Sequence, residues 1–254
     1  MIVMQKIIPF PMSQKKNKVV VPISGGMDST VLLHYAASKF NNVYAISFDY
    51  GQRHIKELIC AEKQIEAIRD KDTEENVHFN TVIELPFFNL IKNSALLDKN
   101  IDVAKARDVM GDPQNLNYVP FRNLMLLSIA CSFAEGVGAD TVYHGAAQAD
   151  SVAGFWDSSP EFLTTINNVT ALNRRNKITI EAPLIDKSKK EIIELGISLG
   201  VDFANTWTCY EGLDEACGEC TACALRLKGF IDVGIEDPLK YSRNIPWDHL
   251  LGNV

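Results

Sequence analysis

The sequence lacks a hydrophobic run long enough to cross a membrane. Its longest apolar segment, LMLLSIACSFA at residues 124–134, falls far short of the roughly 20 residues that a transmembrane helix needs, and it contains two serines. The first 27 residues carry four lysines and no acidic residue, but Pro9, Pro11 and the polar segment SQKKNK interrupt them before any signal-peptide core forms. We therefore expect neither membrane association nor secretion, and we predict a cytoplasmic location.

Positive charge is also scarce. The 254 residues include 25 lysines and arginines against 32 acidic residues, which gives a formal net charge of −7. This balance argues against an extended basic face for DNA or tRNA, so no stable nucleic-acid complex is expected and a small-molecule substrate is favoured. Internal repeats and low-complexity segments are absent too. The length suits one large α/β domain, with or without a small appendage.

Two familiar nucleotide-binding patterns are missing. The glycine-rich segment SGGMDST at residues 24–30 is neither the lysine-containing G-x-x-x-x-G-K-[ST] loop nor the dinucleotide-binding G-x-G-x-x-G turn. A P-loop ATPase and a dinucleotide-dependent dehydrogenase are therefore both disfavoured.

What the sequence does contain is a regular alternation of apolar segments and helical patterns. Four segments are mostly too continuously apolar to have one wet face, which is typical of buried parallel strands: residues 18–24, 42–50, 77–85 and 139–147. Helical patterns cover residues 28–40, 54–70, 121–138, 159–175, 187–200 and 224–234. The alternation predicts an α/β fold with a doubly wound, mostly parallel sheet.

The segment SGGMDST lies between the first predicted strand and the first predicted helix. Its two glycines allow a sharp bend and a close backbone approach, and the amides that open the next helix point outward at the positive end of the helix dipole. This arrangement suits an anion such as phosphate. Asp28 either caps the helix or holds a divalent cation. The alternative for the whole segment is an ordinary strand-to-helix turn.

Four of the six cysteines are crowded into fifteen residues near the C-terminus. They follow the pattern C-x7-C-x2-C-x2-C: Cys209, Cys217, Cys220 and Cys223. The two-residue gaps allow neighbouring thiolates to converge on one ion, and four sulfur ligands favour a structural zinc site with no open position for water. An iron–sulfur cluster and redox-active thiols are the alternatives. Cys60 and Cys131 lie alone and are interpreted as small buried apolar residues.

SGGMDS after a first strand resembles the pyrophosphate-binding loop of the PP-loop ATP pyrophosphatases, which split ATP into AMP and pyrophosphate while they adenylate a substrate. Further segments match one family of this group in the family's own order: SFDYGQRH, YVPFRN, GAAQAD followed by PEF, APLIDKSKKEI, and TWTCYEGLDEACGECTACALRLKGF. Together they cover most of residues 18–230. The chain therefore resembles the 7-cyano-7-deazaguanine synthases of queuosine precursor synthesis.

The resemblance implies an adenine nucleotide hydrolase-like fold and an ATP-dependent carbon–nitrogen ligase, a nitrile synthase. Its substrates are 7-carboxy-7-deazaguanine and ammonia. Adenylation makes the carboxylate an electrophile, ammonia gives the amide, and a second activation of the amide oxygen allows that oxygen to leave and a nitrile to form. AMP and pyrophosphate are the expected products. The resemblance further implies ATP, Mg²⁺ and Zn²⁺ as ligands and a homodimer as the assembly.

The same resemblance implies roles for particular residues. ATP is held by the glycine turn and the end of the second strand: Ser24, Gly25, Gly26, Asp28, Ser29, Thr30, Phe48, Asp49, Tyr50 and Gly51. The substrate is held by Arg122, Asn123, Asp150, Phe155 and Asp157. Trp156 is an alternative stacking residue. The catalytic candidates are Asp28, which also holds Mg²⁺, Arg122 and Lys189.

Plainer interpretations stay open for the basic residues. Arg122 also fits an exposed charge, and Lys189 in KSKK also fits the solvated start of a helix. Arg53 and His54 fit ligands of a phosphate or carboxylate, but His54 equally fits a cap of the following helix.

The chain divides into three predicted parts. Residues 1–17 are an N-terminal extension, residues 18–205 the ATP-binding α/β domain, and residues 206–254 a C-terminal zinc-binding loop with a helix and a tail. Within the domain, residues 86–117 lack clean periodicity and are interpreted as an insertion.

The sequence departs from the family pattern in three places. The basic N-terminal extension precedes the family core, GFWDSS replaces the more usual GYPDC, and the tail after Phe230 is longer. Rival hypotheses are a tRNA-modifying PP-loop enzyme, a glutamine-dependent amidotransferase synthetase, a non-enzymatic zinc module that binds nucleic acid, and a relative that attaches a deazaguanine to a macromolecule.

Overall fold

The computed structural model describes residues 16–70, 76–78, 80–109, 112, 115–152 and 155–251. All but the last two residues of the predicted N-terminal extension lie outside these ranges, and so do the last three residues of the tail. The first strand begins at Lys16, so residues 16 and 17 belong to the sheet.

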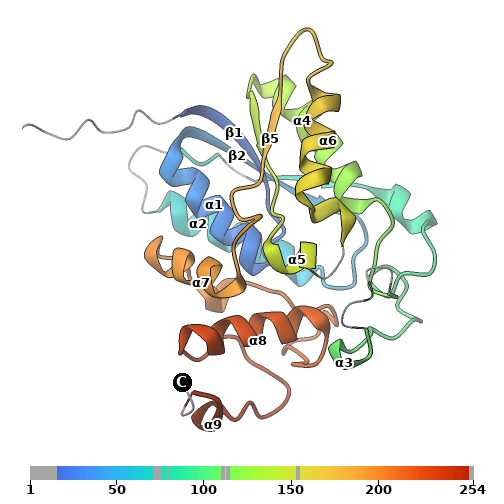
Figure 1. Cartoon of the computed structure of the whole chain (residues 1–254), viewed down its shortest axis with the longest axis vertical. Helices are drawn as coiled ribbons and strands as arrows, with labels where there is room; N and C mark the ends of the chain where they lie inside the picture. Colours follow the sequence, from blue (N-terminus) through green and yellow to red (C-terminus); the bar gives the residue numbers. More distant parts are fainter. Residues whose placement is uncertain are drawn as a thin grey trace, which may run out of the picture.

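Five parallel strands form the central sheet (Figure 1). They are β1 (Lys16–Pro22), β2 (Phe40–Asp49), β3 (Thr81–Glu84), β4 (Thr141–Tyr143) and β5 (Thr179–Glu181). Their order across the sheet is β3-β2-β1-β4-β5, and all neighbours pair in parallel. The chain moves outward from β1 to β3 and then adds β4 and β5 on the other side of β1. The predicted doubly wound parallel sheet is confirmed.

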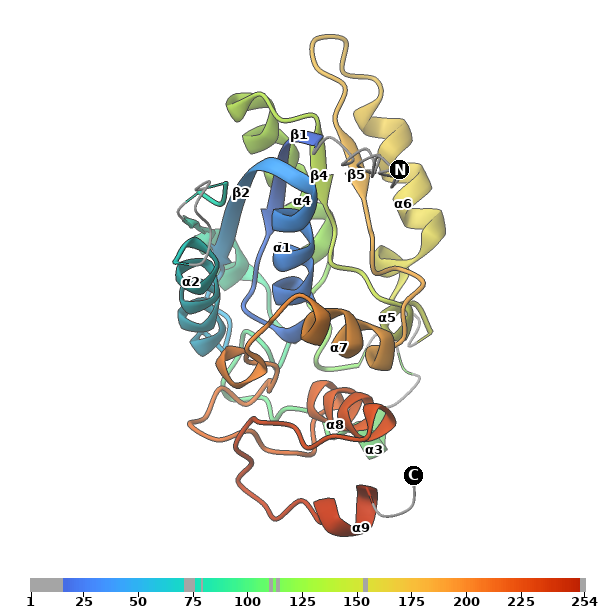
Figure 2. The ribbon, with the colours of Figure 1, turned by 90° about the vertical axis from the view of Figure 1, so that its left-hand side faces the viewer.

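Helices cover both faces of the sheet (Figure 2). One face carries α1 (Met27–Lys39), α2 (Lys56–Arg69) and α7 (Lys189–Ser198), and the other carries α4 (Arg122–Val137) and α6 (Pro160–Thr170). Helix α8 (Thr221–Val233) packs on α7 beyond the carboxyl ends of the strands. The remaining pieces are short: η1 (Pro86–Leu90), α3 (Ala106–Val109), α5 (Gln148–Val152), η2 (Trp156–Ser158), η3 (Phe203–Asn205) and α9 (Trp247–Leu251).

The apolar run of β1 is explained by two cores. Val19 and Val21 pack with α1, α2 and α7, whereas Val20 packs with α4 and α6, and all three side chains are fully buried. Because successive side chains of a strand point to opposite faces, a strand covered on both faces must be apolar at every position.

Three strands differ from the sequence-based prediction. β5 was not predicted, because three residues are too few for a periodic pattern. The predicted strand at 139–147 ends at Tyr143, where the chain leaves the sheet to enter the pocket described below. At the sheet edge, Val77 forms only an isolated bridge with Val43, and β3 begins at Thr81.

Each of the six predicted helices is present, and the largest error in their ends is that α6 stops at Thr170 rather than Arg175. The described residues of the predicted insertion, 86–117, contain only η1 and α3. In the part of the chain that the structure describes, none of the helices has the length and apolar character to span a membrane.

The segment after residue 205 shares a core with the sheet. Phe230 of α8 lies in the same buried cluster as Val31 of α1 and Ile193 of α7. The amide of Trp207 donates to the carbonyl of Gly25 at 2.9 Å. The C-terminal segment is therefore packed directly against the glycine turn. The boundary between residues 205 and 206 stays a prediction from the sequence.

Candidate active site

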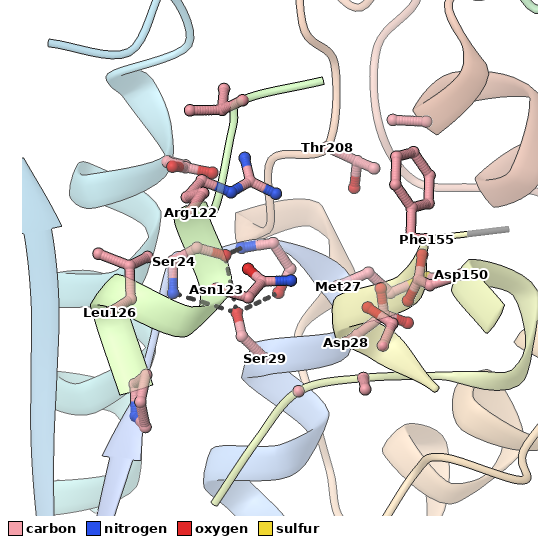
Figure 3. A pocket seen from close by; sticks show the side chains of 18 of the residues that line it. Ser24, Met27, Asp28, Ser29, Arg122, Asn123, Leu126, Asp150, Phe155 and Thr208 are labelled. Atoms are coloured by element: carbon pink, nitrogen blue, oxygen red, sulfur yellow. Dashed lines mark hydrogen bonds between the residues drawn. The ribbon is translucent and has the colours of Figure 1, made fainter. Parts of the chain in front are cut away.

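A pocket of about 310 Å³ opens at the carboxyl ends of the strands (Figure 3). It lies where the sheet changes direction between β1 and β4, the position at which open α/β sheets bind ligands. Twelve of the predicted site residues line it: Ser24, Gly26, Asp28, Ser29, Phe48, Tyr50, Arg122, Asn123, Asp150, Phe155, Asp157 and Lys189. These residues come from six separate segments, and the fold brings them together.

The glycine turn has the geometry of an open helix start. Gly26 is the N-cap of α1 and makes no side-chain capping bond, so Asp28 is not the cap and that interpretation is wrong. Ser24 Oγ and Ser29 Oγ lie 3.0 Å apart, and Ser24 Oγ accepts from the Gly26 amide at 3.1 Å. The two hydroxyls therefore line the same end of the turn as the first amides of α1, which is the donor set that an anion needs.

Gly25 also allows close packing of a neighbouring helix. Its φ of +84° is in the left-handed region, and a Cβ added there would lie 1.9 Å from the carbonyl oxygen of Glu57 in α2. Gly25 does not line the pocket. The missing side chain makes room for α2.

Asp28, Lys189 and Asp150 form a charged cluster beside the glycine turn. Lys189 Nζ donates to Asp28 Oδ2 at 2.8 Å, and the Lys189 side chain is only 11% exposed, so it is not a solvated helix start. Burial lowers the pKa of Lys189, but Asp28 and then Asp150 more than compensate and hold it above its ordinary value. Burial raises the pKa of Asp150, against the effect of Lys189.

One carboxylate oxygen of Asp28 is not used by Lys189. Its Oδ1 atom is buried and has no hydrogen-bond partner among the described residues. A buried carboxylate oxygen without a partner is costly, and a hard cation such as Mg²⁺ prefers this kind of ligand. The residues present therefore fit a magnesium ion.

Arg122 at the start of α4 is partly buried and faces the end of β2. Its Nη1 donates to the Tyr50 hydroxyl at 3.3 Å, so the interpretation as an exposed charge is wrong. Burial works against the charge, yet Tyr50 and Tyr210 hold the pKa of Arg122 above its ordinary value. The guanidinium thus stays charged beside the pocket, where it can bind an anionic group.

Four of the predicted ATP-binding residues do not line the pocket: Gly25, Thr30, Asp49 and Gly51. Thr30 is fully buried, because the helical rotation of about 100° per residue turns it away from the side that Ser29 faces. Asp49 points away because side chains alternate along β2, and its carboxylate accepts from the Gly51 amide at 3.1 Å.

Arg53 and His54, the two basic residues after β2, point in different directions. Arg53 points away from the pocket, and its Nη2 donates to the carbonyls of Asp98 at 3.2 Å and Ile101 at 2.8 Å. His54 lines the pocket and is 4% exposed. Trp156 is 38% exposed and donates to the Tyr118 hydroxyl.

Sequence reasoning missed several pocket residues. They come from α2, from the end of β4 and from the C-terminal segment: Glu57, His144, Thr208, Tyr210 and Arg226. For Glu57 a signal was available, because His54 and Glu57 are three residues apart at a helix start, a spacing that puts them on one face. For the others the sequence offers no local signal.

The four clustered cysteines converge. Their Sγ atoms all lie within 4.8 Å of one another, and Cys217 Sγ accepts from the Cys220 amide at 3.3 Å. Hydrogen bonds from the thiols of Cys209, then Cys220 and Cys223, lower the pKa of Cys217. A thiolate surrounded by three more sulfurs and by backbone amides fits a tetrahedral zinc ion.

Comparisons with known proteins agree with this geometry. The family model described as "Queuosine biosynthesis protein QueC" matches residues 18–234. A 7-cyano-7-deazaguanine synthase of Thermoplasma volcanium is 43% identical over 89% of this chain and 91% of that protein. Proteins of the same name from Nitratiruptor sp. and Psychromonas ingrahamii are 42% and 40% identical, over 88% of this chain and 98% and 97% of theirs. The chain belongs to the QueC family of queuosine biosynthesis proteins.

Proposed function

We propose that this protein is an ATP-dependent ligase that converts 7-carboxy-7-deazaguanine and ammonia into 7-cyano-7-deazaguanine, with release of AMP and pyrophosphate. One observation carries the proposal. The phosphate-type turn at Ser24–Ser29 and the cations Arg122 and Lys189 border a single pocket, in a chain whose relatives bear the name of this activity.

The glycine turn supplies the phosphate site. The first amides of α1 and the hydroxyls of Ser24 and Ser29 would hold the phosphates of ATP. Asp28 would hold Mg²⁺, which neutralises phosphate charge, while Lys189 lies at 2.8 Å from the same carboxylate and would bind a phosphate oxygen. Phe48 and Tyr50 at the end of β2 would contact the adenine.

The opposite side of the pocket would hold the carboxylate substrate. Arg122 stays charged and would bind the carboxylate or its adenylate through paired N–H donors. Asn123 lies next to it. Asp150 and Asp157 are acceptors for the ring N–H groups of a deazaguanine, and Phe155 would stack on the ring.

The finer features of the assembly belong to the same proposal. Zinc at the four cysteines would tie the C-terminal loop to the domain and take no part in the reaction. We expect a homodimer in the cytoplasm, a small-molecule substrate and no stable complex with nucleic acid. Residues 206–254 would act as the zinc-binding part that closes one side of the pocket.

One assay tests the function. Purified protein is incubated with ATP, Mg²⁺, ammonia and 7-carboxy-7-deazaguanine, and the nitrile and AMP are measured by mass spectrometry. We expect both products from the wild type. Asp28→Asn should lower the rate by about 100-fold or more, because it removes a charge beside the phosphates, whereas the exposed Asp186→Asn should retain activity. AMP formed only when tRNA is added would favour a tRNA-modifying enzyme instead.

A further inference from the structure

Every N–H bond of ammonium is lost on the way to a nitrile. Ammonium gives up one proton before its nitrogen can attack, and another proton leaves as the amide forms. The two amide protons are lost to solvent when the amide oxygen departs in AMP. Because we propose that this chain makes a nitrile, its pocket needs a proton acceptor close to the phosphate-binding turn. The inference below rests on that proposed function.

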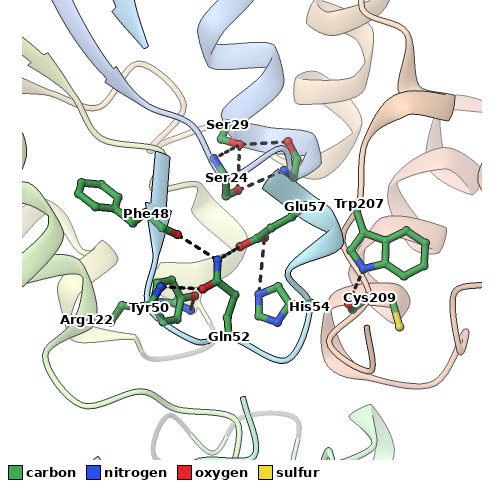
Figure 4. A network of polar contacts seen from close by, with 11 residues as sticks. Ser24, Ser29, Phe48, Tyr50, Gln52, His54, Glu57, Arg122, Trp207 and Cys209 are labelled. Carbon is green, nitrogen blue, oxygen red and sulfur yellow. Dashed lines mark hydrogen bonds and ion pairs between the residues drawn. The ribbon is translucent and has the colours of Figure 1, made fainter. Parts of the chain in front are cut away.

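Glu57 stands in the first turn of α2 and lines the same pocket as Ser24 and Arg122. Figure 4 shows its side chain between the Ser24–Ser29 pair and His54. The backbone of Glu57 lies against the glycine turn, since a Cβ on Gly25 would meet its carbonyl oxygen at 1.9 Å. The position of this carboxyl group is therefore coupled to the position of the turn.

Gln52 and His54 hold the carboxyl group of Glu57. The Gln52 side chain accepts from the Tyr50 amide at 2.9 Å and donates to the Phe48 carbonyl at 3.0 Å, which determines which end of the amide faces Glu57. Its Nε2 then donates to Glu57 Oε1 at 3.3 Å. His54 Nε2 lies 3.5 Å from Glu57 Oε2.

His54 has one more open position. Its Nδ1 atom is buried and has no hydrogen-bond partner among the described residues, although the ring lines the pocket. Burial, and then Arg122 and Arg53, lower the pKa of His54 to about 3, so the ring is neutral at pH 7. A neutral ring with its proton on Nε2, the nitrogen that faces Glu57, keeps a lone pair on Nδ1 for an incoming N–H group.

The surroundings of Glu57 bring its pKa close to neutrality. Burial raises the pKa of Glu57 to about 8, against the smaller effects of Arg122 and Gln52. The titratable groups around it are His54, Tyr50 just after β2, Arg122 from α4 and Cys60 on α2 itself. A base is most effective when its pKa lies near the working pH.

Two other carboxylates of the pocket, Asp28 and Asp150, are engaged by a cation or by the backbone. Asp28 is paired with Lys189 at 2.8 Å, and Asp150 accepts from the Ala147 amide at 3.2 Å. Glu57 is held by a neutral amide and a neutral ring, so it is free to exchange a proton.

We propose that Glu57 is the proton acceptor for the nitrogen donor of this enzyme, with Gln52 and His54 as the residues that position it. The carboxylate takes one proton from ammonium and releases ammonia. The nitrogen lone pair attacks the adenylate carbonyl carbon, a C–N bond forms, and the C–O bond to AMP breaks with its electron pair on the phosphate oxygen.

The later protons follow the same route. The surplus proton on the new C–N nitrogen passes to Glu57 after that carboxyl has returned its first proton to water. When the amide oxygen has been adenylated in turn, the two remaining N–H protons leave as the second C–O bond breaks and C≡N forms. The four protons of ammonium are then all in solvent, and both carboxylate oxygens of the substrate are in AMP.

The test compares Glu57→Gln with Glu66→Gln, an exposed residue of the same helix. Glutamine keeps the shape and the hydrogen-bonding capacity of the side chain but accepts no proton. Three rates are measured: nitrile formation with ammonia, carboxylate-dependent ATP–pyrophosphate exchange without ammonia, and hydroxamate formation with hydroxylamine, a nucleophile that is mostly neutral at pH 7. We expect Glu57→Gln to slow nitrile formation by about 100-fold or more and the other two rates far less, while Glu66→Gln changes none of them.

The pH profile adds a second readout. In the wild type, kcat/KM for total ammonia should rise as Glu57 ionises near pH 8 and fall again when ammonium loses its own proton in water. In Glu57→Gln it should simply rise with the fraction of free ammonia.

The outcomes separate the two proposals. Equal loss of all three rates in Glu57→Gln, or nitrile formation within a few-fold of wild type, would overturn the role of Glu57 and leave the proposed function standing. A wild-type protein that shows neither pyrophosphate exchange nor nitrile would overturn the proposed function itself.

Discussion

At the residue scale, Gly25 occupies a position that has no room for a side chain. Its positive φ and the carbonyl of Glu57 both exclude a side chain. The turn that presents Ser24 and the amides of α1 is thereby locked to α2, the helix that carries Glu57 into the pocket. A glycine that the sequence suggests as an ATP contact is thus also a contact between two elements.

We predict that Gly25→Ala destabilises the protein by at least about 2 kcal/mol, from the left-handed backbone together with the clash. Gly136 in α4 is the matched control, because a Cβ there meets nothing within 4 Å. Gly136→Ala should be neutral or stabilise by up to about 1 kcal/mol. Urea denaturation measures both. A Gly25→Ala protein as stable as the wild type would show that α2 moves freely relative to the turn.

At the scale of elements, the cysteine loop shows how a short segment is ordered without a long helix or strand of its own. The loop from Cys209 to Cys220 is buried mainly through its cysteines and through Ala216, and the first residue of α8 follows it directly. Because this segment has few apolar side chains, we expect a metal ion bound by the four cysteines to contribute to its stability.

We predict that Cys220→Ser loses zinc and lowers the free energy of unfolding by more than about 2 kcal/mol. Cys131→Ser, in α4 and far along the chain, should keep the metal. Metal content by mass spectrometry and thermal unfolding are the measurements. Full zinc retention with lost activity would instead indicate a catalytic thiol.

At the scale of the whole molecule, Arg226 joins α8 to η3, to the segment before the cysteine loop and to the tail. Its fully buried guanidinium donates to Asp237 Oδ2 at 2.6 Å and Oδ1 at 2.8 Å, and also to the Phe203 carbonyl at 3.0 Å and Thr206 Oγ1 at 2.7 Å. The family match ends at residue 234, so the buried partner of Arg226 lies beyond it. The described part of the tail is thus anchored to α8 through Asp237.

We predict that Asp237→Asn destabilises the protein by about 3 kcal/mol, because it leaves a buried arginine without its charge partner. Asp232→Asn breaks the exposed pair with Lys228 on the same helix and should cost less than about 1 kcal/mol. Because the segment after residue 205 shares its core with the sheet, fluorescence and circular dichroism should give one coincident unfolding transition in both variants. Two separate transitions would contradict the shared core.

The sequence by itself determined the fold class, because apolar segments such as Val19–Val21 must be buried on both sides and the intervening segments have helical spacing. It also determined the two local motifs, since SGGMDST and the cysteine spacing carry their chemistry within a few residues. It did not predict the three-residue β5, which is held by pairing with β4 and by hydrogen bonds between the Asn167 side chain and the Ile180 backbone.

Tertiary structure alone decided which polar residues reach the pocket. Thr30 turned into the core and Arg53 turned away, while Glu57 and Tyr210 joined the pocket lining. These outcomes depend on contacts between residues far apart in the chain, and on the low dielectric of a buried site, which raises the pKa of Glu57 and keeps His54 neutral. Neither the contacts nor the dielectric is encoded in a local pattern, and both follow only once α2, α4 and the C-terminal segment close around the glycine turn.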